Sequence, residues 1–296
     1  MKVLNYGSLN VDYVYSVDHI IVGGETQHSS KLEVFSGGKG LNQSIALAKA
    51  GVPVYHAGIV GDDGDILLEA CKEAGVNTKY IRRLPVKGGH TMIQVDKKAQ
   101  NCIILYGGTN QMQTREFVDE VLADFGEGDY LILQNEINML DYIIDQAYAK
   151  KMKIVMNPSP FDDKLNSCDL GKIYLFLVNE IEGEQITGCK DKDQILDALA
   201  AKFPNARFVL TLGSDGAVYY DGSEKVFQDI FKVKAVDTTA AGDTFTGYFI
   251  AATLEGRSIQ ESLRMAAKAS SIAVSRPGAT PSIPTADEVK KELGIM

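Results

Sequence analysis

The chain has 296 residues, of which 45% are hydrophobic and 23% are charged, and this composition is that of an ordinary globular protein with one large core. Its formal net charge of −9 comes without any cluster of lysines and arginines, which argues against nucleic acid as a partner. No apolar run approaches the length of a membrane span, and the four widely spaced cysteines predict reduced thiols in a cytoplasmic protein, neither a disulfide framework nor a metal site.

Short apolar runs alternate along the chain with amphipathic stretches, as in a parallel sheet that is covered by helices on both faces. The predicted strands are Val3–Tyr6, Val54–Val60, Tyr130–Leu133, Lys153–Met156, Phe176–Val178 and Phe208–Thr211. The predicted helices lie at about 41–50, 64–74, 115–124, 138–150, 180–187 and 192–202, with a long helical tail from 243 to 275. The predicted architecture is a right-handed, doubly wound α/β sheet, in a single domain that covers residues 1–296.

Two stretches do not follow this alternation. They are residues 11–36 and 80–106, and the second contains the alternating run Thr91-Met92-Ile93-Gln94-Val95. Alternation of this kind is typical of antiparallel strands, so the two stretches predict a small sheet at the edge of the main domain. We expect segments at about 11–36 and 90–106 to form a lid over a cleft.

A carboxylate stands at the start of the last helical stretch. It is Asp243, which follows three small residues in the run Thr238-Thr239-Ala240-Ala241-Gly242-Asp243. The N–H groups at a helix start attract anions, and small residues let a phosphate approach them. An aspartate there repels the phosphate, and this cost is explained if Asp243 accepts a proton from a hydroxyl that attacks phosphorus. The alternative is an acid that only stabilises the first helical turn.

A glycine cluster lies earlier in the chain, in the run Ser36-Gly37-Gly38-Lys39-Gly40-Leu41-Asn42-Gln43. It lacks the Gly-x-x-x-x-Gly-Lys-Ser/Thr spacing of a phosphate loop, so by itself it favours a flexible turn into a helix. The Gly-x-Gly-x-x-Gly pattern of a dinucleotide fold is absent both here and at Gly7-Ser8-Leu9-Asn10. A nicotinamide-dependent oxidoreductase is therefore disfavoured.

With these two signatures the chain resembles the ribokinase family of sugar and nucleoside kinases. The stretches Gly37–Gln43 and Asp237–Phe245 match the family in sequence, order and separation. The resemblance runs from about residue 6 to residue 284, with shorter matches at Gly7–Asp12, Gly24–Thr26, Gly107–Asn110, Asn135–Glu136, Asn179–Glu182, Thr211–Gly216 and Gly278–Ser282. It implies a ribokinase-like fold, with a mainly parallel sheet and a small β-sheet lid.

The resemblance also implies a reaction, in which a sugar hydroxymethyl group attacks the γ-phosphorus of ATP. Asp243 matches the catalytic base of the family. Ala240, Ala241 and Gly242 match its anion hole, whose N–H groups stabilise charge on the transferring phosphoryl group. Many relatives carry glycine where this chain has Ala240, which is a minor departure.

Sugar binding falls, by the same resemblance, to a set of polar and glycine residues. Carboxylates and amides suit this work because vicinal hydroxyls both donate and accept hydrogen bonds. Taken alone, Asp12 is explained at least as well as a turn residue at a strand end, and the alternative for Glu136 is a helix-capping acid. The lid would close over the sugar and exclude water. The set comprises Asn10, Asp12, Gly38, Lys39, Asn42, Glu136 and Asp243.

The nucleotide is expected on the other side of the anion hole. The resemblance assigns it to a loop and a helix start, with Asn179 and Glu182 acting on the phosphates and on the water shell of Mg²⁺. The family usually has a proline before that asparagine, whereas this chain has Val178. The expected nucleotide-binding residues are Asn179, Glu182, Thr211, Gly213, Ser214, Gly216 and Gly242.

A monovalent cation site is the last feature that the resemblance implies. A K⁺ ion there would neutralise Asp237 and hold the neighbouring anion-hole loop. A plain Pro/Gly turn over 276–284 is the alternative. The expected cation residues are Asp237, Thr239, Ala273, Arg276, Gly278 and Ser282.

The resemblance thus predicts a cytoplasmic ATP-dependent sugar kinase that acts on D-ribose at its 5-hydroxyl. Its cofactors would be ATP, Mg²⁺ and K⁺, and it would form a homodimer through the lid sheet. It would bind a small-molecule sugar, with no nucleic acid or membrane partner. Alternatives are a kinase for another sugar or a nucleoside, or a non-catalytic sugar- or nucleotide-binding protein on the same scaffold. The retention of Asp243 and of the small residues before it argues against the non-catalytic alternative.

Overall fold

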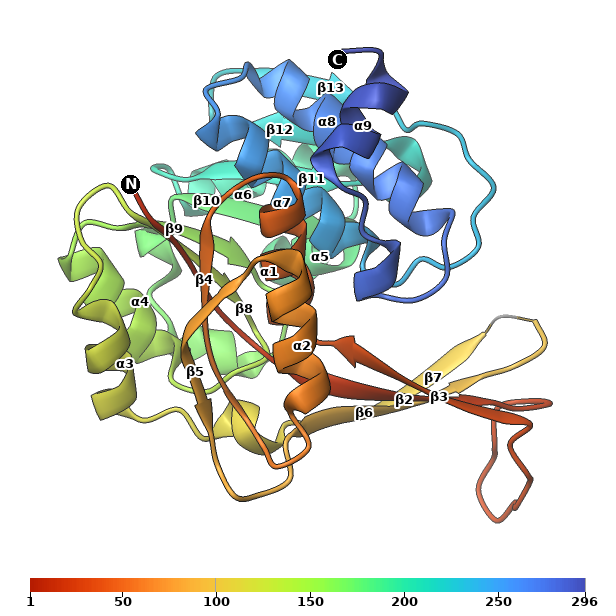
Figure 1. The fold of residues 1–296 in the computed structure, drawn as a ribbon. Coiled ribbons are helices and arrows are strands. Elements are labelled where there is room, and N and C mark those ends of the chain that lie inside the picture. The colour runs from red at the N-terminus through yellow and green to blue at the C-terminus, as the bar shows by residue number, and fades with distance from the viewer. Residues whose placement is uncertain (99, 296) are drawn as a thin grey trace.

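A nine-stranded sheet forms the centre of the computed structural model, which describes residues 1–98 and 100–295 (Figure 1). Its strand order is β13-β12-β11-β10-β9-β8-β1-β4-β5, and neighbouring strands pair in parallel except at β12, which pairs antiparallel with both β11 and β13. The strands are β1 (Val3–Tyr6), β4 (Val54–Val60), β5 (Asn77–Arg83), β8 (Tyr130–Gln134), β9 (Lys153–Asn157), β10 (Leu175–Asn179), β11 (Arg207–Thr211), β12 (Ala217–Tyr220) and β13 (Lys225–Gln228).

Helices cover both faces of this sheet. One face carries α3 (Arg115–Leu122), α4 (Leu140–Ala149), α5 (Glu180–Thr187) and α6 (Lys192–Lys202). The other face carries α1 (Lys39–Lys49), α2 (Asp65–Ala74), α7 (Ala241–Leu254), α8 (Ile259–Val274) and α9 (Ala286–Leu293). Among the described residues, no helix is long and apolar enough to cross a membrane.

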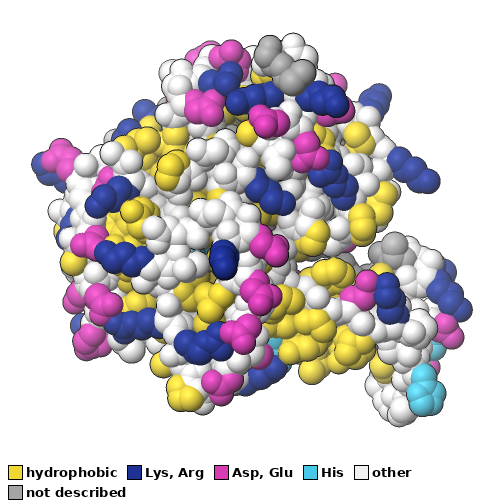
Figure 2. All heavy atoms as spheres, viewed as in Figure 1, with side chains coloured by type: hydrophobic (Ala, Val, Ile, Leu, Met, Phe, Trp, Pro, Cys, Tyr) yellow, Lys and Arg dark blue, Asp and Glu magenta, His cyan; other side chains and the backbone are white. Residues whose placement is uncertain are grey.

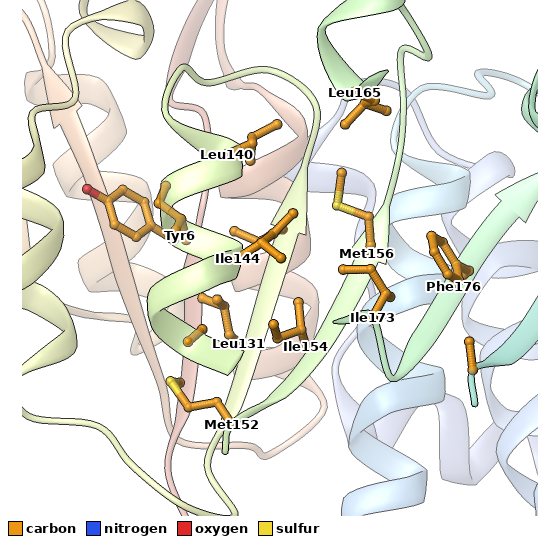
Figure 3. Close-up of a cluster of buried hydrophobic side chains, with 14 of the residues drawn as sticks. Tyr6, Leu131, Leu140, Ile144, Met152, Ile154, Met156, Leu165, Ile173 and Phe176 are labelled. Atoms are coloured by element: carbon orange, nitrogen blue, oxygen red, sulfur yellow. The ribbon is translucent and has the colours of Figure 1, made fainter. Parts of the chain in front are cut away.

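The central strands divide their side chains between two hydrophobic cores. In β8, Leu131 and Leu133 pack on the α3 and α4 side, whereas Tyr130 and Ile132 pack on the α1 and α7 side. Both faces are buried, so such strands appear in the sequence as unbroken apolar runs. Figure 3 shows one of the cores, in which Ile144 of α4 lies above Leu131. The prediction of a doubly wound α/β fold is confirmed.

Four further strands form a separate small sheet, which projects from the main body in Figure 1. They are β2 (Asn10–Ser16), β3 (Lys31–Gly37), β6 (Gly89–Val95) and β7 (Asn101–Tyr106), in the order β3-β2-β6-β7. The prediction that this sheet is antiparallel is wrong for its central pair, because β2 and β6 run parallel. Residue 99 of the predicted segment 90–106 lies outside the described residues. Figure 2 shows hydrophobic side chains gathered where this sheet joins the main body.

Three other predictions need correction. The helical tail expected from 243 to 275 is two helices, because Gly256 adopts a left-handed conformation with φ of 78° and Ser258 caps α8. The stretch 80–106 does not lie wholly outside the main sheet, since β5 pairs in parallel with β4. The strands β12 and β13 at one end of the sheet, each four residues long, and the helix α9 were not predicted.

Candidate active site

A cavity of about 470 Å³ lies at the carboxyl ends of the parallel strands, beneath the small sheet. The chain leaves β1 toward β4 on one side and later returns to β8 on the other. Ligands of open α/β sheets bind at such a reversal of strand order. The cavity is lined by residues from the small sheet, from the starts of α1 and α7, and from the ends of β8, β9, β10 and β11.

Most of the predicted site residues meet in this cavity. All of the expected catalytic and sugar-binding residues line it, together with Asn179, Glu182, Thr211 and Thr239. The other expected nucleotide and cation residues lie outside its lining, namely Gly213, Ser214, Gly216, Asp237, Ala273, Arg276, Gly278 and Ser282.

Asp243 is held by two consecutive residues of α1. Asn42 donates from Nδ2 to Asp243 Oδ2 at 2.9 Å, and Gln43 donates from Nε2 to Asp243 Oδ1 at 2.9 Å. The Asp243 side chain is buried, with 7% of its surface exposed. Among the described residues, the buried Oδ1 of Asn42 accepts no hydrogen bond, so Asn42 contacts Asp243 through its Nδ2 alone. The two helix starts therefore fix the plane of the carboxylate.

The N-terminus of α7 provides free backbone donors beside this carboxylate. Within the described part of the chain, the N–H groups of Gly242 and Asp243 donate to no other protein group, whereas that of Ala241 donates to the carbonyl of Thr238 at 3.2 Å. Ala240 precedes the helix with φ of 58°, a left-handed conformation that costs alanine on the order of 1 kcal/mol. This strained turn aims the free N–H groups at the cavity, where they can bind an anion.

The small sheet contributes Asp12 to the cavity. Thr91 of β6 donates to Asp12 Oδ1 at 2.6 Å, and the other carboxylate oxygen lies over Gly37 of β3. A Cβ atom at Gly37 would lie 1.9 Å from that oxygen, so any side chain at this position would displace the Asp12 carboxylate. Burial raises the pKa of Asp12 to about 6, against the Thr91 hydrogen bond, and the negative charge of Glu136 adds to the rise.

Glu136 follows the end of β8 and faces the start of α1. Its Oε2 accepts hydrogen bonds from Ser8 Oγ and from the N–H of Lys39. Burial raises the pKa of Glu136, although the nearby Lys39 opposes the shift. For Lys39 itself, burial lowers the pKa, but Asp243, Glu136 and Glu182 raise it by more, so its pKa lies above the ordinary value. Lys39 is thus a firmly charged cation in a cavity rich in acids.

Asn10 sits where β2 enters the cavity. Its Oδ1 accepts a hydrogen bond from Asn110 Nδ2 at 2.7 Å, and Asn110 Oδ1 accepts in turn from the N–H of Leu9 at 3.0 Å. The amide orientation of Asn10 is therefore fixed, with its NH₂ group left to donate to a ligand.

The expected phosphate and magnesium residues form a helix cap at the end of β10. Asn179 Oδ1 accepts from the N–H of Glu182 at 2.9 Å, while the two carboxylate oxygens of Glu182 accept from the N–H and Nδ2 of Asn179, each at 3.1 Å. This is a reciprocal capping box. Both residues also line the cavity.

Asp237 joins the loop before α7 to the loop at Gly278. Its Oδ1 accepts from Thr239, both from N–H at 2.9 Å and from Oγ1 at 2.6 Å, and its Oδ2 accepts from the N–H of Gly278 at 2.9 Å. Burial raises the pKa of Asp237, but these hydrogen bonds lower it by more, so its pKa lies below the ordinary value. Within the described residues Asp237 is in no salt bridge. The nearby Arg276 pairs with Glu288 at 2.6 Å.

The remaining predicted residues have structural partners. Ser282 donates from Oγ to the carbonyl of Ala279 at 2.7 Å, and the carbonyl of Ala273 accepts from the N–H of Arg276 at 3.0 Å. The loop that holds Gly213, Ser214 and Gly216 follows Thr211 at the end of β11. Gly213 and Gly216 both have positive φ there, as a sharp turn into β12 demands.

Several cavity residues were missed by the sequence reasoning. Thr91 and Ile93 of β6 line the cavity together with Asn101, Ile103 and Leu105 of β7. The period of two along each strand puts these residues on one face, and the predicted lid segment contained that signal. Asn157 ends β9 and Ser159 follows it, and nothing in the local sequence distinguishes them from turn residues.

Comparison with known proteins adds independent information. The model of the pfkB family of carbohydrate kinases matches residues 1–286. The chain is 34% identical to ribokinase of Haemophilus influenzae, over 97% of this chain and 96% of that protein. It is 35% identical to ribokinase of Schizosaccharomyces pombe, over 100% and 98% of the two chains. Its fold matches the structure of Arabidopsis thaliana ribokinase complexed with ribose and ATP, with a TM-score of 0.88, 30% identity and coverage of 99% and 98%. The chain therefore belongs to the pfkB family of carbohydrate kinases.

Proposed function

We propose that this protein transfers the γ-phosphate of ATP to the 5-hydroxyl of D-ribose. The observation that carries the proposal is the position of Asp243. It lies between cavity side chains of the kind that bind sugar hydroxyls and the free N–H groups of α7. Ribose is favoured because relatives of the same length carry the name ribokinase and because one such protein was solved with ribose and ATP.

In the proposed reaction, Asp243 accepts the proton of the attacking hydroxyl. The sugar oxygen forms a bond to the γ-phosphorus while the bond from that phosphorus to the β,γ-bridging oxygen breaks, and ADP leaves with the electron pair. The N–H groups of Gly242 and Asp243, and the charge of Lys39, stabilise the phosphoryl oxygens during transfer. Asn42 and Gln43 keep the carboxylate in place throughout.

On the sugar side, we assign the ring hydroxyls to Asn10, Asp12 and Glu136. Asp12 has one oxygen occupied by Thr91, and Glu136 has one oxygen occupied by Ser8 and Lys39, so each keeps acceptor capacity for a hydroxyl. The NH₂ group of Asn10 supplies a donor. Vicinal hydroxyls of a sugar donate to such carboxylates and accept from such an amide.

For the nucleotide, we assign the phosphates and Mg²⁺ to the end of β10. Glu182 is 4% exposed and its two oxygens are engaged by Asn179, so a role through metal-bound water fits it better than direct ligation. Bound Mg²⁺ would neutralise phosphate charge. We place the nucleotide base and ribose along the loop from Thr211 to Gly216, next to the cavity wall.

We also propose that K⁺ binds beside Asp237. The carboxylate is ionised and has no cationic partner among the described residues, although it lies close to the turn that binds phosphate. A cation held by Asp237 and by loop carbonyls would remove this unfavourable charge. The donor set of carboxylate and carbonyl oxygens suits a hard cation of this kind.

The small sheet is proposed to act as a lid and as a dimer interface. One of its faces lines the cavity through Asp12, Thr91 and Ile93. On the opposite face, paired residues of all four strands form an apolar row across the sheet, and three of its members are 43% to 63% exposed. We assign a second copy of this chain as the partner of this row, which consists of Val34, Tyr13, Met92 and Ile104. Sedimentation of Met92→Glu as a monomer would support that assignment, and an unchanged dimer would contradict it.

Calorimetry tests the assignment of the sugar side. Asp12→Ala removes one charged acceptor from a closed site, so the affinity for ribose should fall by about 1–3 kcal/mol while that for ATP stays nearly the same. Loss of ATP binding with intact ribose binding would mean that the two halves of the cavity are reversed.

A further inference from the structure

A buried chain of side-chain amides runs behind Asp243, outside the cavity lining. Gln43 Nε2 donates to Asp243 Oδ1 at 2.9 Å, and Gln43 Oε1 accepts from Gln134 Nε2 at 2.7 Å. Gln134 Nε2 also donates to Asn5 Oδ1 at 3.0 Å. The side chains of Gln43, Gln134 and Asn5 are fully buried, and the reaction described above gives the last two no task.

The far end of the chain has a fixed direction. Asn5 Nδ2 donates to the carbonyl of Gly40 at 2.8 Å and to Ser44 Oγ at 2.9 Å, which leaves Asn5 Oδ1 as the acceptor toward Gln134. Ser44 Oγ lies 2.7 Å from His56 Nδ1. Burial lowers the pKa of His56 to about 4, so the imidazole is neutral at physiological pH. Its Nδ1 can therefore accept a hydrogen bond from the Ser44 hydroxyl.

These contacts determine which end of Gln43 faces Asp243. An amide can turn its oxygen or its nitrogen toward a neighbour, and an oxygen beside a carboxylate would repel it. Because Gln134 presents its NH₂ group to Gln43, the oxygen of Gln43 points away from Asp243 and its NH₂ group points toward it. The same NH₂ group also donates to Asn157 Oδ1 at 3.2 Å, which anchors it to the end of β9.

We propose that Gln43 is a positioning residue for phosphoryl transfer, oriented through Gln134, Asn5 and Ser44. This role rests on the proposed function of Asp243 as the base. Asn42 and Gln43 each occupy one oxygen of the carboxylate from the α1 side, so the remaining lone pairs face the sugar hydroxyl. Asn42 lines the cavity but Gln43 does not. Loss of Gln43 should therefore reduce kcat and leave the KM for sugar and ATP nearly unchanged.

The test compares two substitutions of similar size. Gln43→Met removes the donor, and kcat should fall about 10- to 100-fold at every pH, with both KM values within about threefold of the original. Gln43→Glu places a second carboxylate beside Asp243, so its kcat should be low at pH 8. It should recover relative to the original protein as the pH falls toward 5.5, because the protonated glutamate can donate to Asp243. The other charged groups that line the same cavity are Asp12, Lys39, Glu136 and Glu182, and all of them are present in the variant and in the original protein.

A matched control separates this effect from the cost of burying an acid. Gln113 is also a buried glutamine, 4% exposed, and its Oε1 accepts a hydrogen bond from the Tyr6 hydroxyl at 3.2 Å. Gln113→Glu should leave kcat within about threefold of the original and show no relative recovery at low pH. Gln134→Met keeps Gln43 but removes its orienting donor, so kcat should fall several-fold. This variant tests the role independently, should a Gln43 variant fail to fold.

Each outcome decides the matter. Slow turnover at unchanged KM, with recovery of Gln43→Glu at low pH, supports the positioning role. If the original protein is active and Gln43→Met or Gln134→Met turns over equally fast, this role is overturned and the proposed function stands. A Gln43→Glu variant that is folded but equally slow at all pH values would also overturn it. Absence of turnover in the original protein with every sugar would instead overturn the proposed function, and the role of Gln43 with it.

Discussion

Gly247 of α7 lies directly against Ala46 of α1. A Cβ atom at Gly247 would stand 2.4 Å from the Cβ of Ala46, so the two helix backbones touch at this point. Asp243 precedes Gly247 by one helical turn, and Asn42 precedes Ala46 by one turn. The close approach of the two helices thus brings the starts of α1 and α7 within hydrogen-bonding distance of each other.

This contact predicts a coupled loss of stability and activity in Gly247→Ala. The added methyl group must push the helices apart, which should cost about 1–3 kcal/mol of unfolding free energy and lower kcat. Gly126→Ala is the control, because a Cβ at Gly126 would meet nothing within 4 Å. Urea unfolding and steady-state kinetics measure both effects. A Gly247→Ala protein as stable and active as the original would show that the helix contact does not set the site geometry.

Asp243→Asn should retain the fold and both ligands but lose most phosphoryl transfer. The asparagine is isosteric but cannot take up the hydroxyl proton, and loss of a general base typically costs on the order of 10²–10⁴ in rate. Single-turnover kinetics measure the loss, and calorimetry with ribose and ATP checks that binding remains. Near-normal turnover would remove Asp243 from the role of base.

The raised pKa of Asp12 predicts a pH-dependent gain in stability for Asp12→Asn. In the unfolded chain this group ionises near pH 4, whereas in the fold its pKa is about 6. The folded state binds the proton more tightly, so stability that is present below pH 4 is lost as the pH rises through 6. Without ligand, Asp12→Asn should therefore gain on the order of 2–3 kcal/mol relative to the original protein between pH 4 and pH 7.5.

Denaturant unfolding at the two pH values measures this difference, and Asp163→Asn serves as an exposed control. Asp163 is exposed and its Oδ1 accepts a hydrogen bond from Asn166 Nδ2 at 3.3 Å, so this variant measures what the same substitution does on the surface at the two pH values. If the effect of Asp12→Asn on the unfolding free energy did not change with pH, burial would not destabilise a charge on Asp12 in the folded protein.

The Asp237 loop predicts activation by K⁺. At constant ionic strength, Mg²⁺ and ATP, replacing a large organic cation by K⁺ should raise kcat severalfold, because the ion cancels the charge of Asp237 and orders the turn at Ala240. Asp237→Asn should lower both the activity and its dependence on K⁺. Equal rates with and without K⁺, in protein freed of retained ion, would show that protein contacts alone hold the loop.

The sequence predicted the elements whose signal is local. The buried strands β1 and β8 are apolar runs, and the glycine and aspartate motifs lie within a few residues of the helix starts that they serve. The strand β5 was missed because only Tyr80 of its seven residues is buried, as befits an edge strand. Gly256 contains the local signal that divides the expected tail of residues 243–275 into α7 and α8, since glycine often ends a helix in the left-handed conformation.

The contacts around Asp243 could not be predicted in the same way. Gln43 and Asp243 are 200 residues apart, and Gln134 lies 91 residues from Gln43. A single sequence carries no periodicity that connects such positions, and a glutamine in a helix has no distinctive pattern. The contact of Thr91 with Asp12 could not be predicted for the same reason, since Asp12 is 79 residues away on another strand.

The most direct test of the central claim is an assay of ADP release with ATP and a panel of sugars, followed by identification of the phosphorylated position. The panel includes D-ribose, 2-deoxy-D-ribose, D-fructose and adenosine. We predict the highest kcat/KM for D-ribose, by about tenfold or more over the others, because buried polar groups that lose a hydroxyl partner are costly. The product should carry phosphate on O5. A higher kcat/KM for another member of the panel, or no ADP release above the ATPase background with any of them, would contradict the claim.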